Sequence, residues 1–256
     1  SFASLPQGSL IYFQATVISK MLLDKTDLKV RVAPMSGTEA IIAAVERKQA
    51  ELMLLDVTQA AAAINGEEHF KGRPATQLRA IAKMVTFPVG FMVKKDSKYK
   101  TIADLKGAKL PTGWRAFRQG LTLMKATLAT GGLTIDDISG VPTVGLIRAA
   151  DDFKSGRTIG TLIAPTTPKV KEVNAALGGI RFISVGNTPE ALKAVQSVRQ
   201  DFYIMTLKPA PHLPGILSET SLLAFDLALS VGAHVSDEVA YKVAKAVYEN
   251  KKLLAQ

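Results

Sequence analysis

The feature that most constrains the fold is a rhythm repeated along the chain: a short apolar run, a turn of small residues, then an amphipathic helical pattern. The helical patterns fall at residues 9–24, 37–48, 57–65, 115–130, 144–154, 167–177, 188–199 and 236–251. The strand-like runs fall at 28–33, 51–55, 78–85, 89–94, 108–111, 159–163, 180–185 and 202–207. Strands that alternate with helices predict an α/β fold, with a mostly parallel sheet covered by helices on both faces.

Two connectors indicate that the chain forms two lobes. A charged loop follows the apolar strand that ends near residue 94, and a proline-rich connector at 208–220 precedes the apolar run at Leu222. We interpret both as crossings between lobes, so that lobe I comprises 1–93 and 218–256 and lobe II comprises 94–217. A chain that leaves a lobe and returns to it is typical of a hinged protein with a ligand cleft between its lobes.

Several classes of function are excluded by what the sequence lacks. There is no cysteine, so disulfides, thiol catalysis and thiolate metal sites are impossible. The three histidines are scattered and show no metal-binding spacing, and no nucleophile elbow, Walker loop or dinucleotide fingerprint is present. No apolar run reaches the ~18 residues that a membrane-spanning helix needs. We therefore expect neither an enzyme nor a metal or cofactor site, and no membrane protein.

The net charge of +10 raises the question of nucleic acid binding. Lysine and arginine are spread from Lys20 to Lys252, without long runs and without interleaved aromatic residues. This pattern favours a solvated basic surface and predicts that nucleic acid is not a partner. A second interpretation stays open, in which a mildly positive field steers a small anionic ligand.

Four predicted strands are each followed by a turn of glycine, small or hydroxyl-bearing residues that connects the strand to a helix. In open α/β sheets ligands bind outside the carboxyl ends of the strands, where helix N-termini attract anions. The candidate ligand-binding residues are Ser36, Gly37, Thr38, Asp56 and Thr58 in lobe I, and Gly113, Trp114, Arg115, Arg118, Thr166 and Thr167 in lobe II.

Each candidate also has a structural interpretation. Ser, Thr and Asp at helix starts are ordinary N-caps, each stabilising by ~1 kcal/mol. The single tryptophan, Trp114, is either core or a ligand contact, and Arg115 and Arg118 either form surface ion pairs or clamp a carboxylate. Phe13 is a further candidate for an apolar ligand contact, with burial as the alternative. Four polar strand ends in one chain favour a site over caps alone.

The segment "GTEAIIAAVERKQAELMLLDVT" (37–58) resembles the solute-binding proteins of TRAP transporters, specifically the TAXI family. Gly37-Thr38 falls on that family's Gly-Ser turn, Glu51 on the aspartate of its Gly-Glu-x-Asp turn, and Asp56-Val57-Thr58 on its Gln-Ser-Asp. The segments "TIADLKGAKLPTG" (101–113), "SGRTIGTLIAPTTPKVKEV" (155–173) and "LPGILSE" are similar to later parts of the family pattern.

The resemblance implies a two-lobed periplasmic-binding-protein type 2 fold with the ligand cleft between the lobes. It implies a monomeric periplasmic receptor, its signal peptide already removed, that gives a small organic acid to the membrane subunits of a TRAP transporter. The sequence departs from the family at Ile41, where the family has Asn, at Gly160, where it has Asp, and at 116–119, where it has Gly-Ser-Gly-Thr. These changes exchange small polar contacts for an aromatic residue and for the arginines Arg115 and Arg118.

Two other functions stay open. An enzyme on the same fold, such as a dehydratase acting on a cyclic carboxylate, needs a positioned acid, and Asp56 or Glu39 is the best candidate. The effector domain of a transcription regulator is the other, although the sequence given has no N-terminal DNA-binding helices.

Overall fold

The computed structural model describes residues 1–254, and the chain divides into two compact units. Unit 1 contains residues 1–85 and the chain from Asp226 onward, and unit 2 contains residues 86–225. Strands β4 (Leu78–Lys94) and β10 (Thr220–Gly232) contain the points at which the chain passes from one unit to the other. The sequence placed these crossings at the connectors beside residues 94 and 217, whereas the chain crosses inside two long strands.

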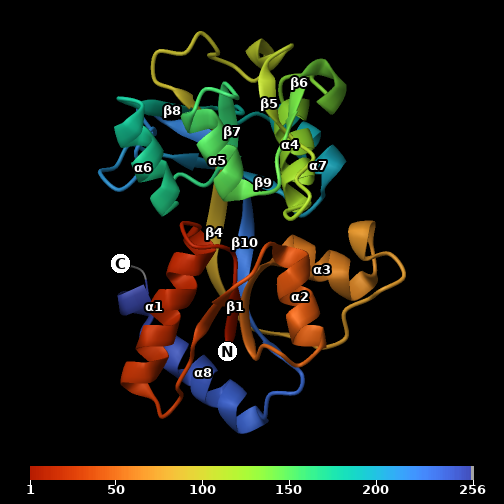
Figure 1. Ribbon diagram of the computed structural model, residues 1–256, viewed down its shortest axis with the longest axis vertical. Helices are drawn as coiled ribbons and strands as arrows, with labels where there is room; N and C mark the ends of the chain where they lie inside the picture. The colour runs from red at the N-terminus through yellow and green to blue at the C-terminus, as the bar shows by residue number, and fades with distance from the viewer. Residues whose placement is uncertain (255–256) are drawn as a thin grey trace. The chain divides into compact units, whose positions relative to one another are not determined.

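Unit 1 is built on three parallel strands, β1 (Phe2–Ser4), β2 (Val32–Pro34) and β3 (Leu52–Asp56), with β1 in the middle. Strand β10 continues this sheet and runs antiparallel to β3. Helices α1 and α8 lie on one side of these strands and α2 and α3 on the other (Figure 1). The helices of the unit are α1 (Leu10–Lys25), α2 (Thr38–Glu46), α3 (Val57–Asn65), α8 (Asp237–Glu249) and α9 (Lys251–Leu254), with the 3-10 helix η1 (Glu68–Phe70).

Unit 2 has a parallel pair, β5 (Lys109–Thr112) with β6 (Ser139–Pro142), and strands β7 (Gly160–Ile163) and β8 (Ile180–Ile183), which both run antiparallel to β4. Strand β9 (Tyr203–Leu207) runs antiparallel to β10. The helices are α4 (Gln119–Ala129), α5 (Leu146–Lys154), α6 (Pro168–Ala176) and α7 (Pro189–Val198), with the 3-10 helices η2 (Ala103–Leu105) and η3 (Ile135–Asp137). Helix α5 packs against α6, and α4 against α7.

The predicted α/β class is confirmed, and each expected helical segment contains a helix. The prediction of a mostly parallel sheet is wrong. Strand β4 runs antiparallel to β7 and β8, and β10 runs antiparallel to β3 and β9. The sequence missed β1, β6 and β10. Strand β1 has three residues and shows no period, β6 contains a glycine and a proline, and β10 is buried on both faces and therefore does not alternate.

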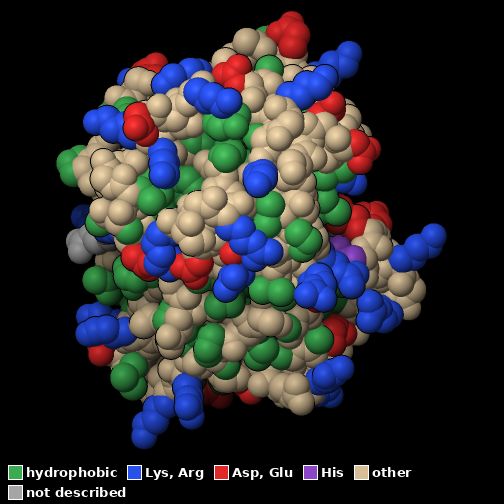
Figure 2. All heavy atoms as spheres, turned by 45° about the horizontal axis from the view of Figure 1, so that its top comes forward, with side chains coloured by type: hydrophobic (Ala, Val, Ile, Leu, Met, Phe, Trp, Pro, Cys, Tyr) green, Lys and Arg blue, Asp and Glu red, His purple; other side chains and the backbone are tan. Residues whose placement is uncertain are grey.

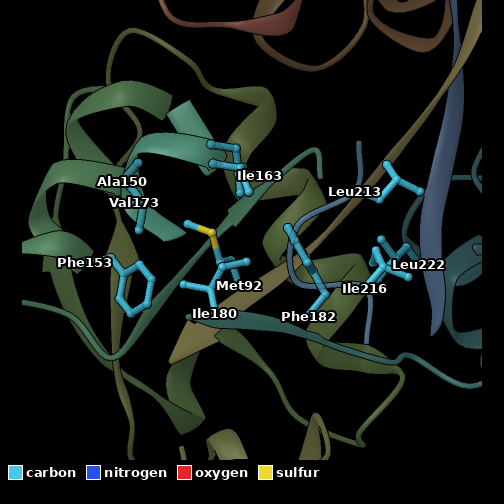
Figure 3. Close-up of a cluster of buried hydrophobic side chains, with 11 residues drawn as sticks. Met92, Ala150, Phe153, Ile163, Val173, Ile180, Phe182, Leu213, Ile216 and Leu222 are labelled. Atoms are coloured by element: carbon cyan, nitrogen blue, oxygen red, sulfur yellow. The ribbon is translucent and has the colours of Figure 1, made fainter. Parts of the chain in front are cut away.

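The core of unit 2 shows why the proline-rich connector belongs to this unit. Leu213 and Ile216 come from that connector and join Met92, Phe153 and Phe182 in one buried cluster (Figure 3). Burying a large apolar side chain contributes about 1.5–3 kcal/mol. The segment is therefore held on the core of unit 2, and the crossing follows it, within β10.

Candidate functional site

The carboxyl ends of the three parallel strands of unit 1 meet at one edge of the sheet. Ser4 pairs with Pro34 in the register of β1 and β2, and Ala3 pairs with Met53 of β3. Helices α2 and α3 follow the ends of β2 and β3 closely, and α1 follows β1 after a short loop. The structure therefore brings the predicted unit 1 candidates to one edge, and Phe13, in α1 and 53% exposed, follows the same edge. These candidates are Ser36, Gly37, Thr38, Asp56 and Thr58.

The start of α2 decides whether its hydroxyl residues are caps. The N-cap residue is Gly37, whose backbone is extended, and no side chain accepts a hydrogen bond from the first turn. Ser36 is exposed and Thr38 is buried, and neither caps the helix. By contrast, Ser9 caps α1 by accepting from the Tyr12 N–H at 3.1 Å. The turn at 36–38 therefore leaves a positive helix end without a capping side chain.

Asp56 has a structural task at the next strand end. Its side chain is buried, and Oδ1 accepts a hydrogen bond of 2.7 Å from the Thr58 backbone N–H, which caps α3. Because the carboxylate is engaged in this cap, its removal would loosen α3 as well as any ligand contact.

An acid–imidazole pair that the sequence did not reveal lies in the same unit. Nε2 of His69 is 3.6 Å from Oε1 of Glu39, and Nδ1 of His69 is 3.7 Å from Glu68. The His69 side chain is only 10% exposed. No sequence signal marks the pair, because thirty positions separate Glu39 from His69 and only the fold places them together.

Two further polar residues at this edge were also missed. The side-chain amide of Gln59, in the first turn of α3, and the hydroxyl of Ser4, at the end of β1, are both buried. Neither group has a hydrogen-bond partner within residues 1–254. Such groups also occur elsewhere in the described chain, for example at Thr127 and Thr161, but these two lie at the strand ends beside the predicted candidates.

In unit 2 the loops that follow β5 and β6 are tied together. The Thr143 N–H donates to the Thr112 carbonyl at 2.8 Å, and the Ala116 N–H donates to the Val144 carbonyl at 2.8 Å. Gly113 adopts a φ of 82°, which favours glycine and turns the chain at the end of β5. The loop that contains Gly113 and Arg115 therefore lies beside the segment that leads into α5.

Trp114 is a core residue. Its side chain is 0% exposed, its ring lies over Gly120, and it meets Phe117 edge-on with ring centroids 6.3 Å apart. Its indole Nε1 is buried and has no hydrogen-bond partner within residues 1–254. Of the predicted aromatic contacts, Phe13 is the one with an accessible ring.

Arg115 and Arg118 are both exposed, at the carboxyl end of β5 and at the N-cap of α4. Arg115 forms no salt bridge with any described residue, so its guanidinium group is available for an anion.

The turn before α6 repeats the pattern of α2. Thr167 is the N-cap residue, yet its hydroxyl makes no capping bond, and this buried oxygen has no partner in the described part of the chain. Thr166 is half-buried beside it. The N-cap residue of α5 is Gly145, again without a side-chain cap, whereas Thr188 caps α7 by accepting from the Ala191 N–H.

The basic residues do not gather on the face shown in Figure 2. Lysine and arginine side chains are scattered over that face, with acidic side chains among them.

A pocket of 460 Å³ in unit 2 lies away from the predicted site. It is lined by Asn174 and by residues of the proline-rich segment, and none of the predicted candidates lines it. Within residues 1–254 no group of three or more metal-binding side chains comes together, and no helix is long and apolar enough to cross a membrane.

Solved structures show where this fold occurs. The chain is similar to an amino acid ABC transporter substrate-binding protein from Streptococcus pneumoniae bound to L-arginine, with a TM-score of 0.57, 14% identity, and coverage of 99% of this chain and 90% of that one. It is similar to a Salmonella typhimurium periplasmic binding protein with high arginine specificity (TM-score 0.56, 13% identity, 98% and 92% covered). It is also similar to a TctC solute binding protein from Polaromonas (TM-score 0.55, 12% identity, 100% and 83% covered).

These likenesses confirm the predicted fold, that of the two-lobed periplasmic solute-binding proteins. A search of the curated proteins found no match. A family model does match, and it spans residues 3–256, nearly the whole sequence. The chain therefore belongs to the NMT1-like family.

Proposed function

We propose that this protein is a periplasmic solute receptor that binds a small organic carboxylate and delivers it to a TRAP-type membrane transporter. The observation that carries the proposal is the set of helix starts without capping side chains. Helices α2, α5 and α6 have Gly37, Gly145 and Thr167 as their N-cap residues, and no side-chain oxygen caps them. Helix α4 also lacks a side-chain cap. Each therefore presents a positive helix end, which favours an anion.

The residues of unit 2 supply the stronger anion site. Arg115 offers a planar fork of donors that matches a carboxylate, and it lies in the loop joined to the start of α5. Thr166 and Thr167 add hydroxyl donors at the start of α6 without adding charge. In unit 1, Ser36, Gly37 and Thr38 offer the corresponding contacts, and Phe13 offers an apolar surface.

The TRAP assignment is the finer part of the proposal, and it rests on the resemblance of residues 37–58 to the TAXI family. The similar solved structures include an amino acid ABC transporter component and a TctC protein, so other transporter classes use the same fold. A monomeric receptor that needs no metal or cofactor is part of the proposal.

A thermal-shift screen tests the ligand class. The panel contains di- and tricarboxylates, L-glutamate and L-arginine, because a ligand that binds only the folded state raises the melting temperature. We expect a rise with an organic acid and none with L-arginine. A rise in melting temperature with L-arginine alone would show that the ligand is an amino acid, and it would reject the carboxylate proposal.

An enzyme is the second candidate, and the pair of Glu39 and His69 is the specific observation in its favour. The carboxylate and the imidazole are 3.6 Å apart, so a proton could pass between them only after a closer approach or through one bridging water. Incubating the acids that raise the melting temperature with the protein, and then searching for product by NMR, separates the two functions. A receptor returns every acid unchanged, and a dehydratase does not.

A further inference from the structure

We infer that Gln59 and Ser4 recognise a hydroxyl or carboxamide group on the bound acid, so that the preferred ligand is a hydroxylated or amide-bearing carboxylate. This inference rests on the proposed function and narrows its ligand class. It starts from the Gln59 side chain, which is 1% exposed. Both its Oε1 and its Nε2 are buried without a hydrogen-bond partner in residues 1–254.

The position of Gln59 excludes the usual task of such a residue. Gln59 is the third residue of α3, where a glutamine often reaches back to the backbone N–H of the N-cap residue. Its side chain makes no such bond, and Asp56 already caps α3 through the Thr58 N–H. The amide of Gln59 is therefore not needed to start the helix.

Ser4 places a second group of the same kind at the same edge. It ends β1, which is parallel to β3 and pairs with it directly, and Gln59 lies in the turn of helix that follows β3. The Ser4 side chain is 0% exposed, and its hydroxyl has no partner in the described part of the chain. Both residues belong to unit 1.

The chemistry of these groups selects the ligand. A carboxamide both donates and accepts hydrogen bonds, and so does a serine hydroxyl. A ligand carboxylate only accepts, which would leave the Gln59 carbonyl oxygen unpaired, and a methylene group would leave every atom unpaired. A ligand hydroxyl or carboxamide satisfies donor and acceptor together. Sites built to hydrogen-bond a substrate hydroxyl strongly disfavour the analogue that lacks it.

Matched acids test the inference. Succinate is compared with L-malate, tricarballylate with citrate, and glutarate with glutaramate, each by thermal shift and by titration calorimetry. We expect at least one acid with a hydroxyl or amide to bind about tenfold or more tighter than its plain partner. If no acid in the set binds, the proposed function and this inference both fail. If plain acids bind as tightly as their partners, this inference alone fails.

A pair of variants separates recognition from a structural role. Gln59→Met keeps the length of the side chain and removes both polar atoms, so it should raise the melting temperature of the free protein by about 2–4 °C. The same change should abolish the preference between matched acids. Ser4→Ala should weaken that preference without lowering the melting temperature.

Gln49→Met is the matched control, because Gln49 is exposed and precedes β3, at the opposite end of that strand. It should change neither the melting temperature nor the preference. A lower melting temperature in Gln59→Met, or an unchanged preference in a folded Gln59→Met, would overturn the inference.

Discussion

At the scale of single residues, the proposed anion site depends most on Arg115. This exposed guanidinium group has no salt bridge within the described residues, so no folded-state ion pair is lost when it is removed. Arg115→Ala should therefore weaken binding of the identified carboxylate at least about tenfold, which equals about 1.4 kcal/mol. The melting temperature of the free protein should stay nearly the same. Titration calorimetry and thermal unfolding measure the two effects.

Variants of two other arginines complete that experiment. Arg118→Ala tests whether Arg118 also binds the ligand carboxylate. Arg31→Ala removes one positive charge from an exposed position in unit 1, so it controls for a general change of charge. Equal affinity in Arg115→Ala, Arg118→Ala and the parent would remove both arginines from the site.

Thr38 gives the corresponding test for unit 1. Thr38→Val keeps the shape of the side chain and removes its hydroxyl, which makes no capping bond to α2. We expect a loss of about 1 kcal/mol or more in ligand binding, measured by calorimetry. Valine at this position should not shorten α2, and an unchanged affinity would show that the hydroxyl makes no contact with the ligand.

Part of the candidate site could be predicted from the sequence. It predicted that hydroxyls would gather at strand ends, because strand and helix patterns meet there. It could not separate caps from binding groups, since both use the same residue types. The structure identifies the caps, because Asp56 and Ser9 cap their helices, whereas Thr38 and Thr167 do not. Ser4 and Gln59 stayed hidden, because burial without a partner leaves no trace in local sequence.

At the scale of elements, α4 depends on the close approach of Trp114. A Cβ atom added at Gly120 would lie 2.4 Å from the indole ring, which is rigid and fully buried. Gly120→Ala should therefore lower the free energy of unfolding by about 1–3 kcal/mol through overpacking. Gly145→Ala is the control, since its added Cβ would meet nothing closer than 4.0 Å. Urea unfolding of both variants is the measurement, and equal stability would contradict this packing.

Helices α5 and α6 are joined by a group of ion pairs with a predictable pH dependence. Burial raises the pKa of Asp151, but the hydrogen bonds and charges of Lys169 and Lys154 outweigh it and leave that pKa below its usual value. Hydrogen bonds from Lys154 and Lys169 lower the pKa of Glu172. A lowered carboxyl pKa stabilises the fold above the unfolded pKa, and this stability disappears as the pH falls through the folded pKa.

The free energy of unfolding should therefore fall as the pH drops below about 4.5, the ordinary pKa of the Glu172 carboxyl group. Lys169→Met should make this fall less steep, because Asp151 and Glu172 lose a shared partner. Urea unfolding between pH 3 and 7 measures the slope, with the exposed Lys193→Met as control. A slope identical to that of the parent would contradict the stabilising role of these pairs.

Local sequence patterns predicted some helices and strands and missed others. Helical segments such as 57–65 and 144–154 were predictable, because an apolar stripe and a defined start give a strong local signal. Strand β1 is too short to show a period, and β6 contains a glycine and a proline. The crossings between units depend on β4 and β10 pairing with distant strands, which no local pattern encodes.

At the scale of the whole molecule, the lysines and arginines behind the net charge of +10 are spread along the sequence, and on the face shown in Figure 2 acidic side chains lie among them. Duplex DNA should therefore bind weakly at low salt, and this binding should disappear at physiological salt, because only phosphate contacts hold it. Fluorescence anisotropy with a labelled duplex at two salt concentrations is the measurement. Nanomolar, sequence-specific binding at physiological salt would contradict the receptor proposal.

The central claim is that strand-end hydroxyls and Arg115 hold a small organic carboxylate. The most direct test is the melting temperature of the parent and of the double variant Thr38→Val/Arg115→Ala, each with and without the acids of the screen. We expect a rise of several degrees for the parent with at least one acid and little or no rise for the double variant. Carboxylate binding at these residues is contradicted if no acid raises the melting temperature of the parent, or if the double variant responds as the parent does.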